Sequence, residues 1–407
     1  MRDKGTNVRL TFVIGLEIPF LGAASRRIEY FADFLSRHGF KVYIISPRIK
    51  YIKCLYSNEK HFKVNLKYNY NLIKVPIMFR FCNSAKLTTI MEILHSIIIA
   101  IIIFITTNDI VIISVPPPRY LLGMYLVASV RKIKLIVDVR DPLDNFYGHS
   151  NKFLFRSLIN ILRHLEYGIL YKSHAITTVN ELLAFDLQRA MPSLTHKIFV
   201  LPNGADLNIF KPVQNLQSQQ ITELKLFFAG RTAEGYNLPL ILEAISRLVQ
   251  KGISVKLYIA GTIEPWVFTY AKRLRILDNV IYLGLLSTDE LISWMSQMDL
   301  AVLPYYNDPH YRYSLPAKFY EYIACGLPVL VSSPPYFIIA KTVQRNKIGI
   351  WCPTNNIDCI INSLSELYIN INKLMVLKQA TLSYRSKVDR KNSANLLLKL
   401  ILKILKL

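Results

Sequence analysis

The chain has 407 residues, which excludes a single ordinary domain and suits two domains of about 200 residues each. Hydrophobic residues make up 52% of the chain, enough for two cores. The formal net charge of +23 exceeds what solubility needs and indicates an anionic partner, such as nucleic acid, an anionic lipid surface or a phosphorylated substrate. The excess of lysine and arginine leans toward the N-terminal half.

The cysteines and the N-terminus bear on the cellular compartment. No Cys-x-x-Cys pair and no Cys/His metal spacing occurs, so we expect reduced thiols and no zinc at the five scattered cysteines, Cys54, Cys82, Cys325, Cys352 and Cys359. The apolar run from Arg9 to Gly15 is too short for a signal peptide, and Glu17 follows it closely. We therefore expect a cytoplasmic protein, peripheral on the cytoplasmic face of the membrane.

The first half alternates between short apolar runs and longer amphipathic segments. This alternation predicts an α/β fold with parallel sheets. Strands are expected near residues 9–14, 41–46, 109–114, 134–139, 175–178 and 197–201. Helices are expected near residues 23–38, 87–105, 118–131, 152–172 and 180–190.

The second half repeats this pattern after a polar, glutamine-rich linker at residues 213–222. Strands are expected near residues 224–229, 255–260, 280–283, 300–304, 329–332 and 348–351. Helices are expected near residues 238–251, 265–276, 288–298, 316–325, 335–345 and 357–371. We therefore predict one domain over residues 1–212, a second over 213–385, and a separate C-terminal helix over 386–407.

Two segments carry information about membranes. Ile93 to Ile105 is an apolar run of 13 residues, shorter than the roughly 20 that span a bilayer. It predicts a buried core helix, with a helix that dips shallowly into a membrane as the alternative. In the C-terminal segment, Lys399, Lys403 and Lys406 recur at helical spacing among leucine and isoleucine. This pattern is typical of a basic amphipathic helix that lies on an anionic membrane.

The most informative segment runs from Ser314 to Ser332. Pro316 suits the first turn of a helix, where its missing N–H costs nothing, and Gly326 suits the left-handed position that ends one. Such a helix starts at the carboxyl end of one strand and points its N-terminus at the crevice where α/β sheets bind phosphorylated ligands. Lys318 and Glu321, in or near its first turn, are suited to hold a diphosphate and a ribose.

The pattern Leu-Pro-x-Lys-x-x-Glu-Tyr-x-Ala-x-Gly-x-Pro-Val in this segment resembles the nucleotide-sugar-binding motif of the large retaining glycosyltransferase family with the GT-B fold (family 4). Other segments resemble that family in the expected order: Gly22–Arg27, Gly39–Ile45, Asp138–Asp141, Thr177–Leu183, Leu201–Pro212, Phe228–Arg231, Tyr258–Gly261, Tyr282–Gly284 and Asp299–Pro304. The resemblance implies two Rossmann-like domains facing across a cleft. It also offers an alternative for the C-terminal segment, since the long C-terminal helix of GT-B enzymes packs onto the N-terminal domain.

The resemblance implies that fixed cations, rather than a metal, stabilise the negative charge on the departing β-phosphate. No Asp-x-Asp motif that would hold a divalent metal occurs. Arg231 follows a strand and Gly230, and in the family this arginine contacts the diphosphate. The family's second basic residue falls at Tyr236 in this chain. Our hypothesis is that Lys318 supplies the missing charge, with Arg312 as a second candidate.

The second Glu of the family's Glu-x7-Glu motif corresponds to Glu321, which implies hydrogen bonds to the ribose hydroxyls. The first Glu falls at Tyr313, so the identity of the donor sugar does not carry over. Nucleotide-sugar binding is further expected at Gly22, Gly230, Ser314, Leu315 and Gly284.

Residues of the first domain are expected to serve the acceptor side. Gly22 and Ala23 open the first long helix, and their small size lets the backbone approach a sugar or phosphate. Asp141 ends a strand, where it is suited to position or deprotonate the acceptor hydroxyl. Its alternative role is to cap the chain before Pro142.

The predicted function is a glycosyltransferase that uses a nucleotide-sugar donor with retention of configuration and needs neither metal nor other cofactor. The acceptor is expected to be a lipid-linked or other glycan at an anionic membrane surface. Nucleic acid is not an expected partner, because no helix-turn-helix, zinc finger or RNA-binding signature accompanies the charge. The alternatives are a nucleotide-sugar 2-epimerase, a glycogen-synthase-like polymerase, and a non-catalytic partner in a glycan-assembly complex.

Overall fold

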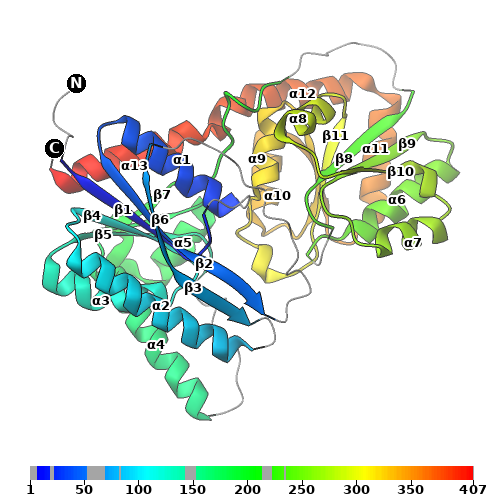
Figure 1. Cartoon of the computed structure of the whole chain (residues 1–407). Helices are drawn as coiled ribbons and strands as arrows, with labels where there is room; N and C mark the ends of the chain where they lie inside the picture. Colours follow the sequence, from blue (N-terminus) through cyan, green and yellow to red (C-terminus); the bar gives the residue numbers. More distant parts are fainter. Residues whose placement is uncertain are drawn as a thin grey trace. The chain divides into compact units, whose positions relative to one another are not determined.

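The chain forms two compact α/β units (Figure 1). The structure is a computed structural model that describes residues 7–18, 23–52, 69–81, 84–142, 153–212, 222–232 and 235–406. Unit 1 comprises Met1–Pro202 together with Ser393–Leu407, and unit 2 comprises Asn203–Asn392. The C-terminal segment therefore belongs to the unit that the N-terminal half forms.

Unit 1 is built on a seven-stranded parallel sheet of order β3-β2-β1-β4-β5-β6-β7. Its strands are β1 (Arg9–Ile14), β2 (Lys41–Ile52), β3 (Asn71–Phe81), β4 (Ile110–Val115), β5 (Lys134–Val139), β6 (Ala175–Thr178) and β7 (Ile198–Val200). The sequence predicted every strand of this sheet except β3. That strand lies at the edge of the sheet, and Lys74, Pro76 and Arg80 interrupt the apolar pattern that marks a central strand.

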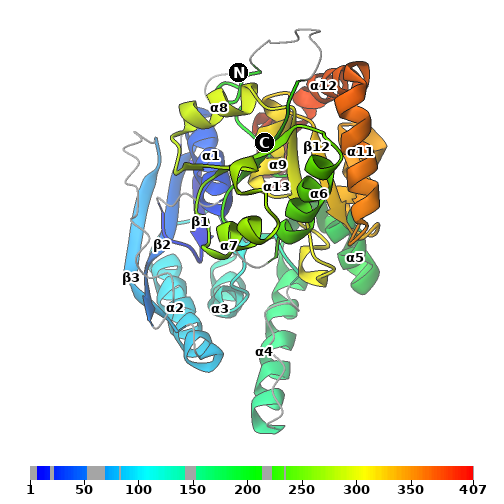
Figure 2. The ribbon, with the colours of Figure 1, turned by 90° about the vertical axis from the view of Figure 1, so that its right-hand side faces the viewer.

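Helices cover both faces of this sheet: α1 (Ala23–Arg37), α2 (Ala85–Ile105), α3 (Tyr120–Arg131), α4 (Phe153–Lys172), α5 (Glu181–Ala190) and α13 (Arg390–Leu405). Apolar side chains of α1 and α13 share one core with β1, β2 and β4. Helix α2 packs against β3 and α3, and α3 packs against β4 and α4 (Figures 1 and 2).

The C-terminal helix uses its apolar face for packing within unit 1. Leu397, Leu400 and Ile401 are buried in the core that also contains Leu10 and Phe12 of β1. The three lysines of the predicted basic face, Lys399, Lys403 and Lys406, are exposed. The amphipathic pattern is therefore confirmed, and its apolar side packs against the protein itself.

Helix α2 differs from the buried core helix that we predicted. It is 21 residues long, and its Leu87–Ile105 segment is long and apolar enough to cross a membrane by length and composition. Only 28% of the most apolar 18-residue window of this segment is buried. The prediction of a core helix was wrong because β3 and α3 contact one side of α2 and leave much of its surface exposed.

Unit 2 is a six-stranded parallel sheet of order β10-β9-β8-β11-β12-β13. Its strands are β8 (Leu224–Ala229), β9 (Val255–Ala260), β10 (Val280–Gly284), β11 (Leu300–Pro304), β12 (Val329–Ser333) and β13 (Gly349–Pro353). One core joins the sheet to α6 (Leu238–Gln250), α7 (Trp266–Arg273), α11 (Ile357–Ile369) and α12 (Ile371–Tyr384). A second core joins it to α8 (Thr288–Ser296), α9 (Ala317–Ala324) and α10 (Ile338–Asn346). All six strands lie where the sequence predicted them.

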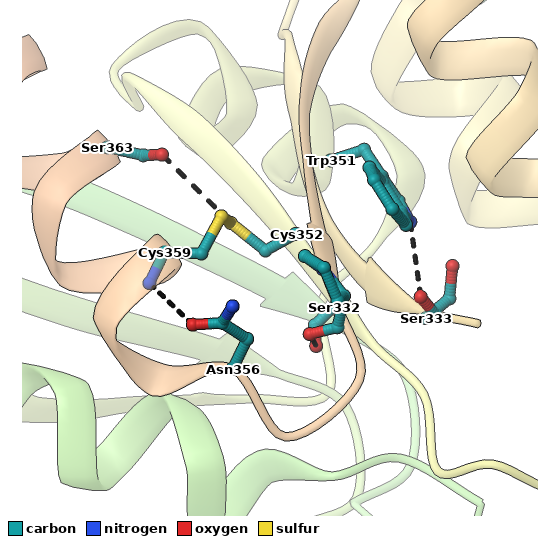
Figure 3. The surroundings of a disulfide bond; sticks show 8 residues. Ser332, Ser333, Trp351, Cys352, Asn356, Cys359 and Ser363 are labelled. Atoms are coloured by element: carbon teal, nitrogen blue, oxygen red, sulfur yellow. Dashed lines mark hydrogen bonds between the residues drawn. A yellow bond between two sulfur atoms is a disulfide. The ribbon is translucent and has the colours of Figure 1, made fainter. Parts of the chain in front are cut away.

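A disulfide links β13 to the first turn of α11 in unit 2 (Figure 3). It joins Cys352 to Cys359, whose Cα atoms are 5.7 Å apart, and the Asn356 side chain accepts a hydrogen bond from the Cys359 N–H. The expectation of reduced thiols is therefore wrong for this pair, because the strand-to-helix turn brings the two residues together. Cys325 is a buried free thiol, and Cys54 and Cys82 lie outside the described residues.

Candidate functional site

The strand order of unit 2 defines where a ligand is expected to bind. β8 is first in sequence and pairs with β9 on one side and β11 on the other, so the connections run in opposite directions from β8 and β11. Ligands of open α/β sheets bind outside the carboxyl ends of the strands at such a switch point. Gly230 and Arg231 follow β8, and the segment that leads into α9 follows β11. The predicted donor-site residues of the second domain therefore belong to the segments that meet at this point, except Gly284, which ends the edge strand β10.

Three glycines form the backbone floor of this edge. Gly230, Gly261 and Gly284, at the ends of β8, β9 and β10, have φ angles of +124°, +114° and +76°. The Gly230 N–H donates to the Ala260 carbonyl at 2.8 Å, and the Gly261 N–H donates to the Gly284 carbonyl at 2.7 Å. A Cβ atom on Gly261 would lie 2.3 Å from the Gly230 oxygen. The chain after β9 can therefore approach the Gly230 carbonyl only because Gly261 has no side chain.

Replacing Gly261 with alanine is expected to destabilise the protein more than replacing Gly252, although both glycines have positive φ angles. Gly252, with φ +78°, has open space around its Cβ position, so Gly252→Ala should cost only about 1 kcal/mol of backbone strain. Gly261→Ala adds the clash with Gly230 and should cost roughly 2 kcal/mol more. Chemical denaturation of the two variants measures this difference, and equal losses would contradict the close approach.

Helix α9 is attached firmly to the strand ends. The Tyr322 hydroxyl accepts a hydrogen bond from the Ala229 N–H at 2.7 Å, which ties α9 to the end of β8. Gly326 has φ +77°, and its N–H bonds to the Ile323 carbonyl, while the N–H of the next residue bonds to the Tyr322 carbonyl. This Schellman ending confirms the predicted helix stop. Pro316 is the N-cap, so the helix begins one residue later than predicted.

Lys318 projects its ammonium group into an aromatic cage beside the glycine floor. Its Nζ lies 3.8 Å from the ring centroid of Phe228 and 3.9 Å from that of Tyr236. It also lies 3.2 Å from the point that a Cβ atom on Gly230 would occupy. The Nζ is buried and has no hydrogen-bond partner among the described residues. Burial lowers the pKa of Lys318 to about 7, against the opposing effect of the Glu321 carboxylate. A buried, unpartnered amine at this position is suited to receive an anion.

Tyr236 is a wall of this cage rather than a source of charge. Its ring packs against Tyr305 at a centroid distance of 5.3 Å, and the two backbones form an isolated antiparallel bridge. Burial raises the pKa of Tyr236 to about 12, so the phenol is neutral near neutral pH. The residue in place of the family's second basic residue therefore stacks on the ammonium of Lys318. The sequence did not predict this cage. Its one sign in the sequence is that two aromatic residues, Phe228 and Tyr236, stand on either side of Gly230 and Arg231.

Arg231 lies next to a carboxylate that the sequence analysis did not single out. Its Nε is 3.9 Å from Glu264 Oε1, and about a third of each side chain is exposed. The Glu264 N–H donates to Thr232 Oγ1 at 2.8 Å, and the Thr232 N–H donates to the Thr262 carbonyl at 3.0 Å, so the turns after β8 and β9 are linked. A long, partly exposed ion pair of this kind contributes little stability and leaves the arginine able to exchange partners.

The remaining donor-site residues surround the start of α9. Glu321 is 7% exposed and lies three residues after Lys318, on the same face of the helix. The Ser314 N–H donates to the Tyr311 carbonyl at 3.0 Å, and Leu315 packs against the core shared by α8, α9 and α10. Arg312 stacks on the neighbouring Tyr313 ring, with 5.1 Å between its guanidinium carbon and the ring centroid.

In unit 1, Asp138 of β5 and Asp141, which follows that strand, have different surroundings. Asp138 is buried, forms an ion pair with Arg27 at 3.2 Å, and accepts a hydrogen bond from Thr177 Oγ1 at 2.8 Å. Asp141 is exposed as a residue, but desolvation of its carboxyl raises the pKa of that group, against the opposing effect of the Arg140 guanidinium. Gly22 lies outside the described residues, and α1 begins at Ala23 as expected.

Within the described ranges, no group of three or more His, Cys, Asp or Glu side chains is placed to hold a metal ion. The predicted donor site contains the cationic side chains of Arg231 and Lys318. That transfer needs no metal stays a prediction.

Comparison with known proteins identifies the class of this fold. Residues 214–382, which lie in unit 2, match the family Glycosyl transferases group 1. The whole chain superimposes on a sucrose-phosphate synthase from Thermosynechococcus elongatus with a TM-score of 0.71, 13% identity, and coverage of 98% of this chain and 99% of that one. The two Rossmann-like domains are those of GT-B glycosyltransferases, which confirms the predicted fold.

Two further proteins are similar to this chain. TuaH of Bacillus subtilis (strain 168), named as a glycosyltransferase of teichuronic acid biosynthesis, is 23% identical over 192 residues. That match spans 46% of this chain and 47% of TuaH, about half the length of each. Anabaena HepE in complex with UDP-glucose superimposes with a TM-score of 0.65 and 11% identity, covering 98% of this chain and 100% of that one. Residues 214–382 of unit 2 thus match a glycosyl transferases group 1 domain, and the two units have the GT-B fold.

Proposed function

We propose that this protein is a glycosyltransferase that moves a sugar from a nucleotide-sugar donor to a glycan acceptor, with retention of configuration and without a metal. The observation that carries the proposal is the ammonium of Lys318, which is buried beside Gly230 and has no hydrogen-bond partner in the part of the chain that the structure describes. The group 1 match of unit 2 and the likeness to HepE in complex with UDP-glucose support a nucleotide-sugar donor.

The chemistry follows from where charge develops. When the bond between the sugar and the diphosphate breaks, negative charge grows on the β-phosphate. Lys318 and Arg231 are proposed to face that phosphate and to stabilise its charge without reorganising. Because the pKa of Lys318 is near 7 before binding, the diphosphate should draw a proton onto the amine and complete the ion pair inside the cage. Glu321 is proposed to accept hydrogen bonds from the ribose hydroxyls.

Unit 1 is proposed to supply the acceptor side. Asp141 is exposed at the carboxyl end of β5, where its carboxylate can accept a proton from an attacking hydroxyl. We propose a lipid-linked glycan as the acceptor, which accords with the net charge of +23 and the apolar surface of α2. The proposed location is the cytoplasmic face of a membrane. In a reducing cytoplasm, Cys352 and Cys359 would be a dithiol, so thiol labelling of the protein in cells tests this location.

A thermal-shift screen tests the donor site. The protein is heated with UDP, GDP, ADP and dTDP and with their common sugar conjugates. One of these ligands is expected to raise the melting temperature, because a ligand that binds only the folded state stabilises it by mass action. Slow hydrolysis of the matching donor, followed by NMR, then reports the anomer released first, and chelator in the same assay tests the metal-free reaction.

The second candidate is a non-catalytic partner in a glycan-assembly complex, which the tyrosines at positions 236 and 313 favour. If a cooperatively melting protein shows no shift with any nucleotide, the donor site is degenerate and this second function holds. Binding without hydrolysis or transfer would place the defect in the chemistry rather than in the site.

A further inference from the structure

Helix α2 carries a continuous apolar face that the described residues leave uncovered. Seven large apolar side chains along it are between 44% and 72% exposed: Leu87, Ile90, Leu94, Ile97, Ile101, Phe104 and Ile105. At 3.6 residues per turn they fall within an arc of about 100°, so they form one stripe along the helix. Single exposed apolar residues are ordinary, but a contiguous stripe of this length marks an interaction surface.

The opposite face of α2 is fixed to unit 1. His95, Ser96, Ile99 and Ile103 are buried. The Ser96 hydroxyl accepts a hydrogen bond from the Gly123 N–H of α3 at 2.7 Å, and a Cβ atom on Gly123 would lie 2.3 Å from the Ser96 carbonyl oxygen. Because the two backbones touch at this glycine, α2 is part of the folded unit and its apolar stripe is a permanent surface.

The packing of α2 against α3 indicates whether α2 spans a membrane or lies on its surface. The helix is long enough to span, but its buried polar side chains already have their environment inside unit 1. Insertion across a bilayer would require α2 to leave α3 and expose those groups to hydrocarbon. A helix with one face packed and one face apolar is suited to lie in the membrane plane. Figure 2 shows α2 and α3 side by side in unit 1, as their packing requires.

The charged residues beside the stripe indicate what binds to it. At its C-terminal end, the guanidinium carbon of Arg131 lies 5.4 Å from the centroid of the Phe104 ring, and Lys132 follows; both side chains are exposed. Glu92 is the single charged residue between Leu87 and Ile105, and helical spacing places it away from the stripe. A second copy of the chain would bring an equally cationic border to the contact, whereas an anionic bilayer brings the opposite charge.

We propose that the apolar stripe of α2, with Arg131 and Lys132 at its border, docks this protein onto an anionic lipid bilayer. The helix lies parallel to the membrane plane, with the stripe at the boundary between headgroups and acyl chains. The inference deepens the proposed lipid-linked acceptor by naming the membrane-binding surface. It differs from the C-terminal helix favoured by the sequence pattern, since the apolar side of α13 is buried within unit 1.

Vesicle sedimentation tests the proposal without any sugar donor, so its failure is separate from failure of the transferase function. The full chain is mixed with vesicles of phosphatidylcholine alone or of phosphatidylcholine with phosphatidylglycerol. The double variant Ile97→Glu/Ile101→Glu is expected to bind the anionic vesicles at least tenfold more weakly than the wild type. The matched control is Ile369→Glu/Val376→Glu, which changes two apolar side chains of unit 2 that are 81% and 67% exposed and should bind as the wild type does.

A second pair of variants separates the charge from the apolar contact. Arg131→Glu/Lys132→Glu is expected to weaken binding to anionic vesicles severalfold and to reduce its salt dependence, with little change on neutral vesicles. Wild-type binding by Ile97→Glu/Ile101→Glu would overturn the proposal. The proposal would also fail if the wild type bound no vesicles and formed a dimer in light scattering that Ile97→Glu/Ile101→Glu dissociated. The stripe would then be a contact between two copies of the chain.

Depth in the bilayer is measured with Ile101→Trp, which keeps a large apolar side chain at an exposed position. The emission of the added tryptophan is obtained by subtracting the wild-type spectrum. It is expected to shift to the blue when the protein binds anionic vesicles. Lipids brominated near the headgroup end of the acyl chain should quench it more strongly than lipids brominated near the chain end. The reverse order would mean that α2 crosses the membrane, and no shift in a folded variant would mean that α2 does not touch it.

Discussion

Replacing Lys318 with methionine is expected to lower the turnover of sugar transfer by about 100- to 1,000-fold, the usual cost of removing one preorganised group that stabilises developing charge. Methionine has a similar length and can occupy the space between Phe228 and Tyr236 without a charge. Steady-state kinetics with the donor identified in the screen measures the effect. Lys341→Met, which changes an exposed lysine of α10, is the matched control and should turn over as the wild type does.

The same variant has a signature in proton uptake. At about one pH unit above the pKa of Lys318, the amine of the unliganded protein is largely neutral. Binding of a nucleoside diphosphate should then take up close to one proton. Calorimetry in buffers of different ionisation enthalpy counts that proton. Lys318→Met should bind with no such uptake. If its turnover and proton uptake both match those of the wild type, the charge at the β-phosphate comes from elsewhere, with Arg231 and Arg312 as the candidates.

The stability of the protein without ligand should also report Lys318. Its pKa is about 7 in the folded protein and 10.5 in the ordinary state, so between these values the unfolded chain binds the extra proton. The contribution of Lys318 to the free energy of unfolding therefore rises with pH across this window, by up to about 1.4 kcal/mol per pH unit, and is smallest below pH 7. Lys318→Met should lack this rise when the two proteins are compared by urea denaturation.

Replacing Glu321 with glutamine is expected to weaken binding of the nucleoside diphosphate by roughly tenfold to hundredfold, the range for loss of a charged hydrogen-bond partner. Glutamine keeps the shape of this buried side chain, so the variant should fold. Isothermal titration measures the affinity. Glu366→Gln, at an exposed position of α11, is the control for loss of one carboxylate from unit 2.

A ligand lacking the ribose hydroxyls makes this prediction specific. The wild type should prefer the nucleoside diphosphate over its 2′,3′-dideoxy analogue, and Glu321→Gln should largely lose that preference. A variant that weakens both ligands equally would show that Glu321 acts through Lys318 rather than through the ribose. That outcome has a physical basis, because the Glu321 carboxylate favours the charged form of Lys318.

The order of strands and helices could be predicted because the central strands of parallel sheets are buried on both faces. Such strands appear in the sequence as continuous apolar runs, as at residues 329–331 of β12 and at Leu300–Pro304. The edge strand β3 gives a weaker signal, because it has one neighbour and tolerates Pro76 and charged residues. The end of α9 at Gly326 could also be predicted, because it depends on one residue in the left-handed conformation, which the sequence alone can indicate.

The sequence by itself determined the alternation of strands and helices, the two-domain organisation and the motif that places Lys318 and Glu321 on one helix. These features depend on residues close together in the chain. The tertiary structure decided what surrounds them. Phe228 and Tyr236 enclose the Lys318 amine, Cys352 meets Cys359, and α2 exposes Ile97 and Ile101 while α13 buries Leu397 and Leu400. The hydropathy of a residue says that its side chain is apolar. Whether the side chain is buried depends on which distant segment packs against it. The packing segment is set by the order of the strands and by the helices on each face of the sheet.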